Sequence, residues 1–138
     1  MKKIVCYVIG CFVLAFSLVQ AGEEIKTKNV LENIPYGDEA MGRRKLVSEN
    51  YLLMMQVALK PGQSVPNHNA NSNVHILIVK GEVVITLNGR DIDAREGALV
   101  PVGFKTPMSV ANKSKENASF LVIKTPNPNQ MTEQAGQK

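Results

Sequence analysis

The sequence contains a series of short β-forming runs, with turn residues between them and no helical period. The runs cover residues 51–59, 74–80, 83–87, 91–94, 98–102, 108–111 and 119–124. Several short strands at such close spacing are typical of an all-β sandwich or barrel. The sequence therefore predicts one all-β domain over residues 51–126.

The residues between the runs indicate specific turns. Asn88 and Gly89 are the preferred pair for a two-residue type I′ hairpin, because both central positions need a positive φ. This pair predicts a hairpin between the runs 83–87 and 91–94. Gly62, which follows a proline, and Gly81 indicate two further tight reversals.

The N-terminus has the pattern of a secretory signal peptide. Lys2 and Lys3 precede an apolar run over residues 4–19, and small residues stand just before Gly22, as a signal peptidase requires. We therefore expect residues 1–21 to be removed and the protein to be periplasmic or secreted, with no membrane segment after cleavage. An uncleaved N-terminal anchor is the alternative, although the run is short for a membrane span.

Cleavage would change both the redox chemistry and the charge of the chain. Cys6 and Cys11 lie in the leader, so the mature chain would have no thiol and would depend on a packed core for its stability. Loss of Lys2 and Lys3 would lower the formal charge from +4 to +2. Residues 43–45 form the remaining basic cluster, which is typical of a solvated turn. A nucleic-acid partner is not expected.

Polar segments flank the predicted domain on both sides. Residues 22–50 are expected to form an N-terminal arm, with one helical turn at 29–33 that Pro35 ends. After residue 124 two prolines prevent strand continuation, so residues 127–138 are expected to form a flexible tail.

Two intervals within the β-rich region have the spacing of a paired motif. The first is marked by Gly62, His68, Ala70, Val74 and Gly81, and the second by Gly97, Met108 and Asn112. This spacing resembles the two motifs of the small single-domain cupins, and the resemblance covers roughly residues 52–126. It implies a double-stranded β-helix, or jelly-roll barrel, whose two sheets enclose a pocket.

The same resemblance implies where a metal would be bound. Metal-dependent cupins place His, His and Glu in the first motif and His in the second, and these positions are His68, Ala70, Val74 and Met108 here. Ala and Val have no lone pair to donate. One imidazole and one thioether form a poor site for a divalent metal ion, so neither a metal nor another cofactor is expected.

His75 is the residue that could restore a metal site, since it follows the position of the missing Glu. Side chains alternate along a strand, so if Val74 and Ile76 face the pocket, His75 faces away. A shift of one residue would reverse this orientation. A site with His68 and His75 as joint ligands therefore stays open as an alternative.

The expected pocket is mostly apolar, with polar groups at its mouth. Its predicted apolar lining is Val74, Ile76, Ile78, Leu99 and Met108, and the predicted polar contacts are His68, Asn71 and Asn73. A pocket of this kind suits a small organic ligand with one polar end. The alternative is that this histidine and these asparagines bind neighbouring backbone, as such residues do in loops and turns.

Three functions are consistent with these observations. The first is an exported, metal-free binding module for a small molecule that is not identified, and this is the function we predict. The second is a cupin enzyme, either with a metal at His68 and His75 or with His68 alone as a general base. The third is an interaction protein that forms a homodimer, in which the arm adds to the edge strand of a neighbour.

Overall fold

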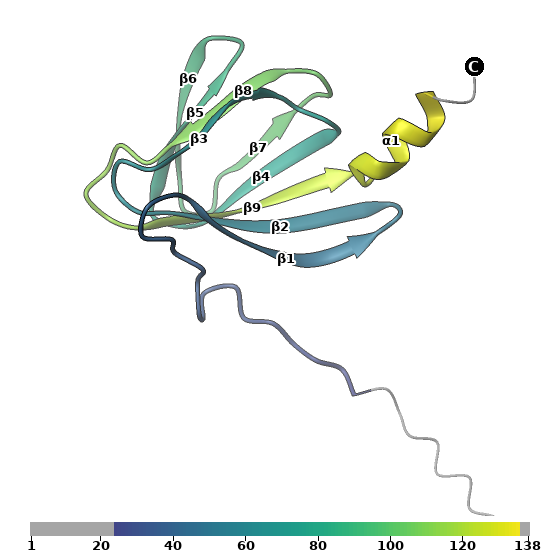
Figure 1. Cartoon of the computed structure of the whole chain (residues 1–138). Coiled ribbons are helices and arrows are strands. Elements are labelled where there is room, and N and C mark those ends of the chain that lie inside the picture. Colours follow the sequence, from purple (N-terminus) through teal and green to yellow (C-terminus); the bar gives the residue numbers. More distant parts are fainter. Residues whose placement is uncertain (1–23, 136–138) are drawn as a thin grey trace, which may run out of the picture.

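The computed structural model describes residues 24–135, and the predicted leader lies outside the described residues. The described chain forms nine strands and one helix (Figure 1). Their bounds are β1 Gly42–Glu49, β2 Leu52–Leu59, β3 Ser64–Asn69, β4 Asn73–Lys80, β5 Glu82–Leu87, β6 Arg90–Arg95, β7 Leu99–Val102, β8 Pro107–Ala111, β9 Ala118–Thr125 and α1 Pro128–Ala135.

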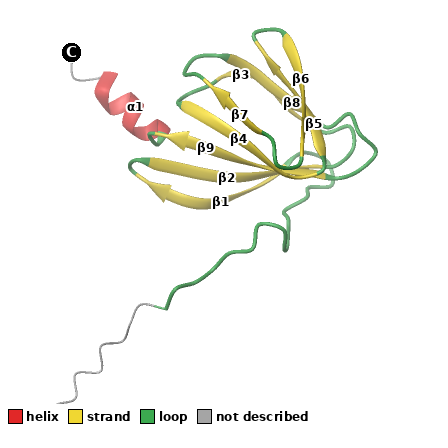
Figure 2. Cartoon of the chain, turned by 180° about the vertical axis from the view of Figure 1, so that it is seen from behind, coloured by secondary structure: helices red, strands yellow, loops and turns green. Residues whose placement is uncertain are grey.

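The strands form two antiparallel sheets that face each other (Figure 2). One sheet has the order β1-β2-β9-β4-β7, and the other has the order β3-β8-β5-β6. The apolar core lies between them and includes Phe120, Ile76, Ile85 and Val110. Burial of each such side chain contributes roughly 1.5–3 kcal/mol. The structure confirms the all-β prediction.

Burial along β4 alternates as the sequence predicts. Val74, Ile76 and Ile78 are 2%, 0% and 1% exposed, whereas His75 and Leu77 are half-buried. This period of two follows from the pleat, which directs successive side chains to opposite faces of a sheet. The first set faces the opposite sheet and the second set faces outward.

The predicted turns form as expected. Asn88 and Gly89 both have positive φ, at 50° and 77°, which is the requirement of a type I′ hairpin between β5 and β6. Gly81, with φ 71°, makes the reversal between β4 and β5. Its backbone also lies so close to its neighbours that an added Cβ would be 2.5 Å from the Asn117 carbonyl oxygen.

Two strands were not predicted from the sequence. β1 lies in the segment assigned to the arm, and it is an edge strand whose GRRKLVSE sequence is polar on both faces. β3 contains Pro66, which lacks the donor that a sheet ladder needs. The structure accommodates this proline because β3 is an edge strand and its pairing with β8 is irregular between Val65 and His68.

The segment before β1 is held on the outer face of the five-stranded sheet. The Arg44 Nε donates to Gln56 Oε1 at 2.8 Å, and its Nη1 donates to the Asn33 carbonyl at 3.0 Å. Gln56, which is fully buried, in turn donates through Nε2 to the Val30 carbonyl at 2.7 Å and to Ser119 Oγ at 2.9 Å. This part of the predicted arm therefore packs on its own barrel.

A helix follows β9 where the sequence was expected to continue as a tail. Asn127 precedes its first residue, and its Oδ1 accepts from the Asn129 amide at 3.3 Å. Asn127 also donates through Nδ2 to the Glu49 carbonyl at 3.1 Å, which fixes the start of α1 to the end of β1. Asn at the N-cap and Pro128 at the first helical position are favourable for a helix start. In the described part of the chain, no helix is long and apolar enough to span a membrane.

Candidate binding pocket

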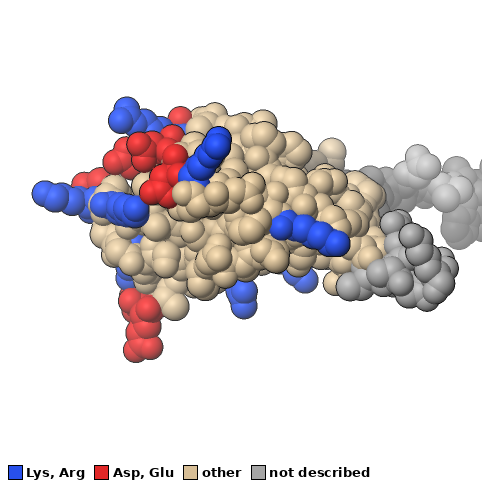
Figure 3. All heavy atoms as spheres, turned by 90° about the horizontal axis from the view of Figure 1, so that it is seen from above, with Lys and Arg blue, Asp and Glu red and all other residues tan. Residues whose placement is uncertain are grey.

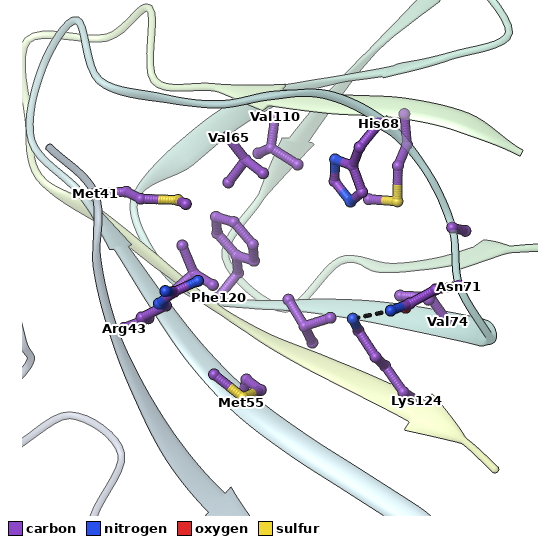
Figure 4. Close-up of a pocket in the computed structure, with 14 residues that line it drawn as sticks. Met41, Arg43, Met55, Val65, His68, Asn71, Val74, Val110, Phe120 and Lys124 are labelled. Carbon is purple, nitrogen blue, oxygen red and sulfur yellow. Dashed lines mark hydrogen bonds between the residues drawn. The ribbon is translucent and has the colours of Figure 1, made fainter. Parts of the chain in front are cut away.

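A pocket of about 250 Å³ lies between the two sheets (Figure 4). The five-stranded sheet forms one wall through Met55, Val57, Val74, Phe120 and Val122. The other sheet forms the opposite wall through Val65, Met108 and Val110, and Met41 and Ala70 complete the apolar lining. Four polar side chains share the pocket with them, namely Arg43, His68, Asn71 and Lys124.

The strand register explains why these side chains share one face. Arg43 of β1 pairs with Val57 of β2, which pairs with Phe120 of β9. Four residues further along β9, Lys124 pairs with Val74 of β4. Residues at even separations along a strand face the same side, so each of these pairs is directed toward the pocket.

All four positions that correspond to the metal ligands of metal-dependent cupins line this pocket. His68 lies opposite Met108 in the β3–β8 pairing, and Ala70 and Val74 lie beside them. Their donors are one imidazole and one thioether, which do not fit a site for a divalent metal ion. Within the described residues, no three His, Cys, Asp or Glu side chains gather at one place.

His68 lies in β3 and not in a loop. Its Nδ1 is 2.9 Å from the Pro66 carbonyl oxygen, and because a carbonyl can only accept, Nδ1 must carry the proton. Nε2 remains available to a ligand. His75 does not line the pocket and pairs with Pro101 and Ile123 in the sheet, so the structure does not bring the two histidines to one site.

The other predicted contacts divide between the pocket and its surroundings. Asn71 lines the pocket, but Asn73 does not, and Asn73 Oδ1 accepts from the Phe104 amide at 3.2 Å. Ile76 and Ile78 are core residues outside the pocket lining. The prediction for Leu99 was wrong, because this side chain is 58% exposed on β7.

Two basic residues of the pocket were missed by the sequence analysis. Lys124 is half-buried, and its Nζ donates to Asn71 Oδ1 at 2.9 Å. Burial lowers the pKa of Lys124 below its ordinary value, because an apolar surrounding disfavours the charged amine. Arg43 is exposed on the other side of the pocket (Figure 4). Alternation along β9 after Phe120 and Val122 would have placed Lys124 on the inner face.

The described lining of the pocket has positive side chains, Arg43 and Lys124, and no negative ones. Among the described residues that line it, none is Asp or Glu. The ion pairs of the described chain lie elsewhere and are Lys60–Asp38, Arg95–Glu82 and Lys113–Asp91. On the face seen in Figure 3, the acidic side chains gather toward one end of the molecule. An anion would therefore meet no repulsion from a lining carboxylate.

Comparisons with known proteins agree with this architecture. A protein of Methanocaldococcus jannaschii, MJ0764, is 33% identical over 88 residues, which are 63% of this chain and 76% of that protein. Its crystal structure, an RmlC-like cupin with a double-stranded β-helix fold, matches with a TM-score of 0.68 and 28% identity over 80% of this chain and 99% of its own. The protein TT1209 from Thermus thermophilus matches with a TM-score of 0.69 and 23% identity, over 74% and 98%. The cupin domain profile matches residues 55–124, and the chain belongs to the cupin family.

Proposed function

We propose that this protein binds a small organic molecule in the pocket between its sheets, without a metal ion. The observation that carries the proposal is that apolar side chains, which line one cavity, stand at three of the four positions that hold the metal ligands in metal-dependent cupins. A thioether and two hydrocarbon groups at Met108, Ala70 and Val74 make a surface for apolar contact. The same cavity retains a few polar groups, which is the usual composition of a small-molecule site.

The size of the cavity restricts the ligand. Its volume of about 250 Å³ lies just below the range that is usual for ligand pockets, about 300–1,000 Å³, which favours a molecule smaller than a typical drug. Burial of about 150 Å² of apolar ligand surface would contribute about 4 kcal/mol. Association itself costs at least about 4 kcal/mol. Apolar contact alone would leave little net affinity, so the polar groups must decide which ligand is held.

The predicted leader supports a site of action outside the cytoplasm. A signal peptide at this position would direct export of the domain to the periplasm or the medium, and cleavage before Gly22 would release the mature chain. N-terminal sequencing of the protein recovered from its native compartment should begin at Gly22. A chain that still begins at Met1 would contradict export with cleavage and leave the binding proposal unaffected.

Thermal-shift measurements on chelator-treated protein test the binding proposal. A ligand that binds only the folded chain must raise the melting midpoint, by about 5 °C or more near saturation. Val122→Phe should fill the pocket and abolish the shift. Ile123→Phe is the matched control on the opposite face of β9, and it should keep the shift. If no class of small molecule stabilises the protein, or if both variants behave alike, the proposal is wrong.

A further inference from the structure

We propose that the ligand is a small organic acid whose carboxylate is bound by Lys124 and Asn71. This inference rests on the proposed function and assigns the chemical class of its ligand. The apolar body of the acid would lie against Val74, Met108 and Val122, deeper in the same pocket.

The first argument concerns the charge on Lys124. Its side chain is half-buried in a mostly apolar pocket, and Asn71, its hydrogen-bond partner, is neutral. Burial already lowers its pKa, so the charged amine is poorly compensated in the free protein. No described carboxylate lines the pocket to balance it. A ligand carboxylate would supply the missing negative charge, and a charge-assisted hydrogen bond of this kind is among the stronger ones in proteins.

The second argument concerns the geometry of Asn71. Its Oδ1 accepts from Lys124 Nζ, which orients the amide so that Nδ2 is left to donate. The two side chains together therefore offer an ammonium and an amide N–H next to each other (Figure 4). Asn71 is exposed, so this pair lies at the mouth of the pocket. A carboxylate held there would direct the apolar body inward.

Arg43 adds a second positive charge but not the main carboxylate contact. It lies in the same cross-strand row as Phe120, and Lys124 is four residues further along β9, about 13 Å along the strand direction. The two cations therefore stand on different sides of the pocket. Because Arg43 is exposed, solvent and salt screen its charge more than that of half-buried Lys124. The Arg43 guanidinium has no ion-pair or hydrogen-bond partner within the described residues.

Calorimetric titration with matched ligand pairs tests this assignment. The probes are straight-chain monocarboxylates of four to ten carbons and phenylacetate, each compared with its neutral amide, on chelator-treated protein. The best carboxylate should bind at least about tenfold more tightly than its amide. Lys124→Gln should reduce this preference to less than about threefold, whereas Lys124→Arg should keep most of it. Arg90→Gln, which removes an exposed charge from β6, should leave the preference unchanged.

The possible outcomes separate the inference from the proposed function. If amides bind as tightly as carboxylates, the assignment of an acid is wrong and the pocket is still a small-molecule site. If a carboxylate preference persists in a folded Lys124→Gln variant, with an unaltered circular dichroism spectrum, the role of Lys124 is wrong. If neither carboxylates nor amides bind, and thermal-shift screening finds no stabilising compound, both proposals fail.

Discussion

Arg43 and Arg44 are adjacent on β1, yet the two faces of the sheet give them different roles. Arg44 faces outward and donates to Gln56 and to the carbonyls of Asn33 and Glu32, at 2.8, 3.0 and 3.2 Å. Arg43 faces the pocket and has no such partner within the described residues. On the outer face a polar group is satisfied by the chain itself. On the inner face the Arg43 guanidinium has no such partner among the residues that the structure describes, which is what a ligand site there would require.

The same division recurs on β2 and β9. Gln56 is fully buried on the outer face with its amide paired on both sides, whereas its neighbour Met55 lines the pocket. Ser119 Oγ donates to the Val57 carbonyl at 3.0 Å, whereas the partner of Lys124 on the inner face, within the described part of the chain, is the neutral amide of Asn71. Satisfied buried polar groups stabilise a fold, and partly buried cations without a counter-charge indicate a binding site. Substitutions on the two faces should therefore have different effects, on stability for the outer face and on ligand binding for the inner face.

Gly42→Ala should have the largest effect on stability, because it would push the segment before β1 away from the five-stranded sheet. A Cβ at Gly42 would fall on the Pro35 carbonyl oxygen, which is backbone and cannot move without displacing the segment before β1. We expect the free energy of unfolding to fall by about 4 kcal/mol or more. Gly103→Ala is the control, since its Cβ would meet only Thr106 Oγ1 at 3.6 Å. Equal urea midpoints for the two variants would show that the close contact between Gly42 and Pro35 does not stabilise the fold.

Gln56→Leu should have the next largest effect. It would leave the Arg44 Nε, the Val30 carbonyl and Ser119 Oγ without their present partners in a buried site. We expect a loss of about 2–3 kcal/mol, measured by chemical denaturation. Met55→Leu makes the matching change on the inner face, and a volume-conserving swap there should cost less than about 1.5 kcal/mol. A reversed order of the two losses would show that the outer hydrogen bonds are not the stabilising ones.

Arg44→Gln and Arg43→Gln compare the two faces at adjacent residues. Loss of the Arg44 hydrogen bonds should lower the free energy of unfolding by about 1–2 kcal/mol. Loss of Arg43 should change it by less than about 0.5 kcal/mol, as is usual for an exposed side chain. Carboxylate affinity should show the opposite order and fall about threefold in the Arg43 variant alone. Denaturation and calorimetry on the same two variants provide both measurements.

Lys124→Met should have the smallest effect on stability, and the sign depends on pH. Burial holds the pKa of Lys124 below its ordinary value of 10.5, so between the two values the unfolded chain binds more protons than the folded chain. Stability from this group therefore rises with pH across that alkaline window and is lowest at neutral pH. The methionine variant should lose this rise and be as stable as wild type, or more stable, at neutral pH. A clear loss of stability at pH 7 would mean that the amine is well compensated in the free protein.

The parts of the fold that the sequence predicted are those where one local rule decides the structure. Val74, Ile76 and Ile78 alternate with polar or less buried neighbours, and only one register buries them. Asn88 and Gly89 tolerate the positive φ that their turn requires. Both local signals identify their elements without knowledge of tertiary contacts.

The parts that were missed depend on contacts between distant segments. β1 has polar residues on both faces, because its outer face contacts the segment before it and its inner face borders the pocket. The strand therefore shows no apolar alternation. Arg43 was therefore placed in a turn and not in the site. β3 was not predicted because it contains Pro66, which is compatible with a strand here since β3 lies at a sheet edge. Two local signals do predict features that were missed. Alternation along β9 predicts that Lys124 faces inward, and the pair Asn127 and Pro128 predicts the start of α1.

An NMR titration of the methionine methyl groups would locate the bound ligand, because Met54 and Met55 report from opposite faces of β2. Met41, Met55 and Met108 line the pocket, whereas Met54 pairs with Ile123 in an outward-facing row and is outside the lining. Chelator-treated protein labelled at the methionine methyl carbons would be titrated with the best-binding carboxylate and with its amide. We predict saturable shifts at the three pocket methionines with the carboxylate, much weaker ones with the amide, and no change at Met54. Equal shifts at Met54 and Met55, or no shift at Met108 at millimolar carboxylate, would contradict the account.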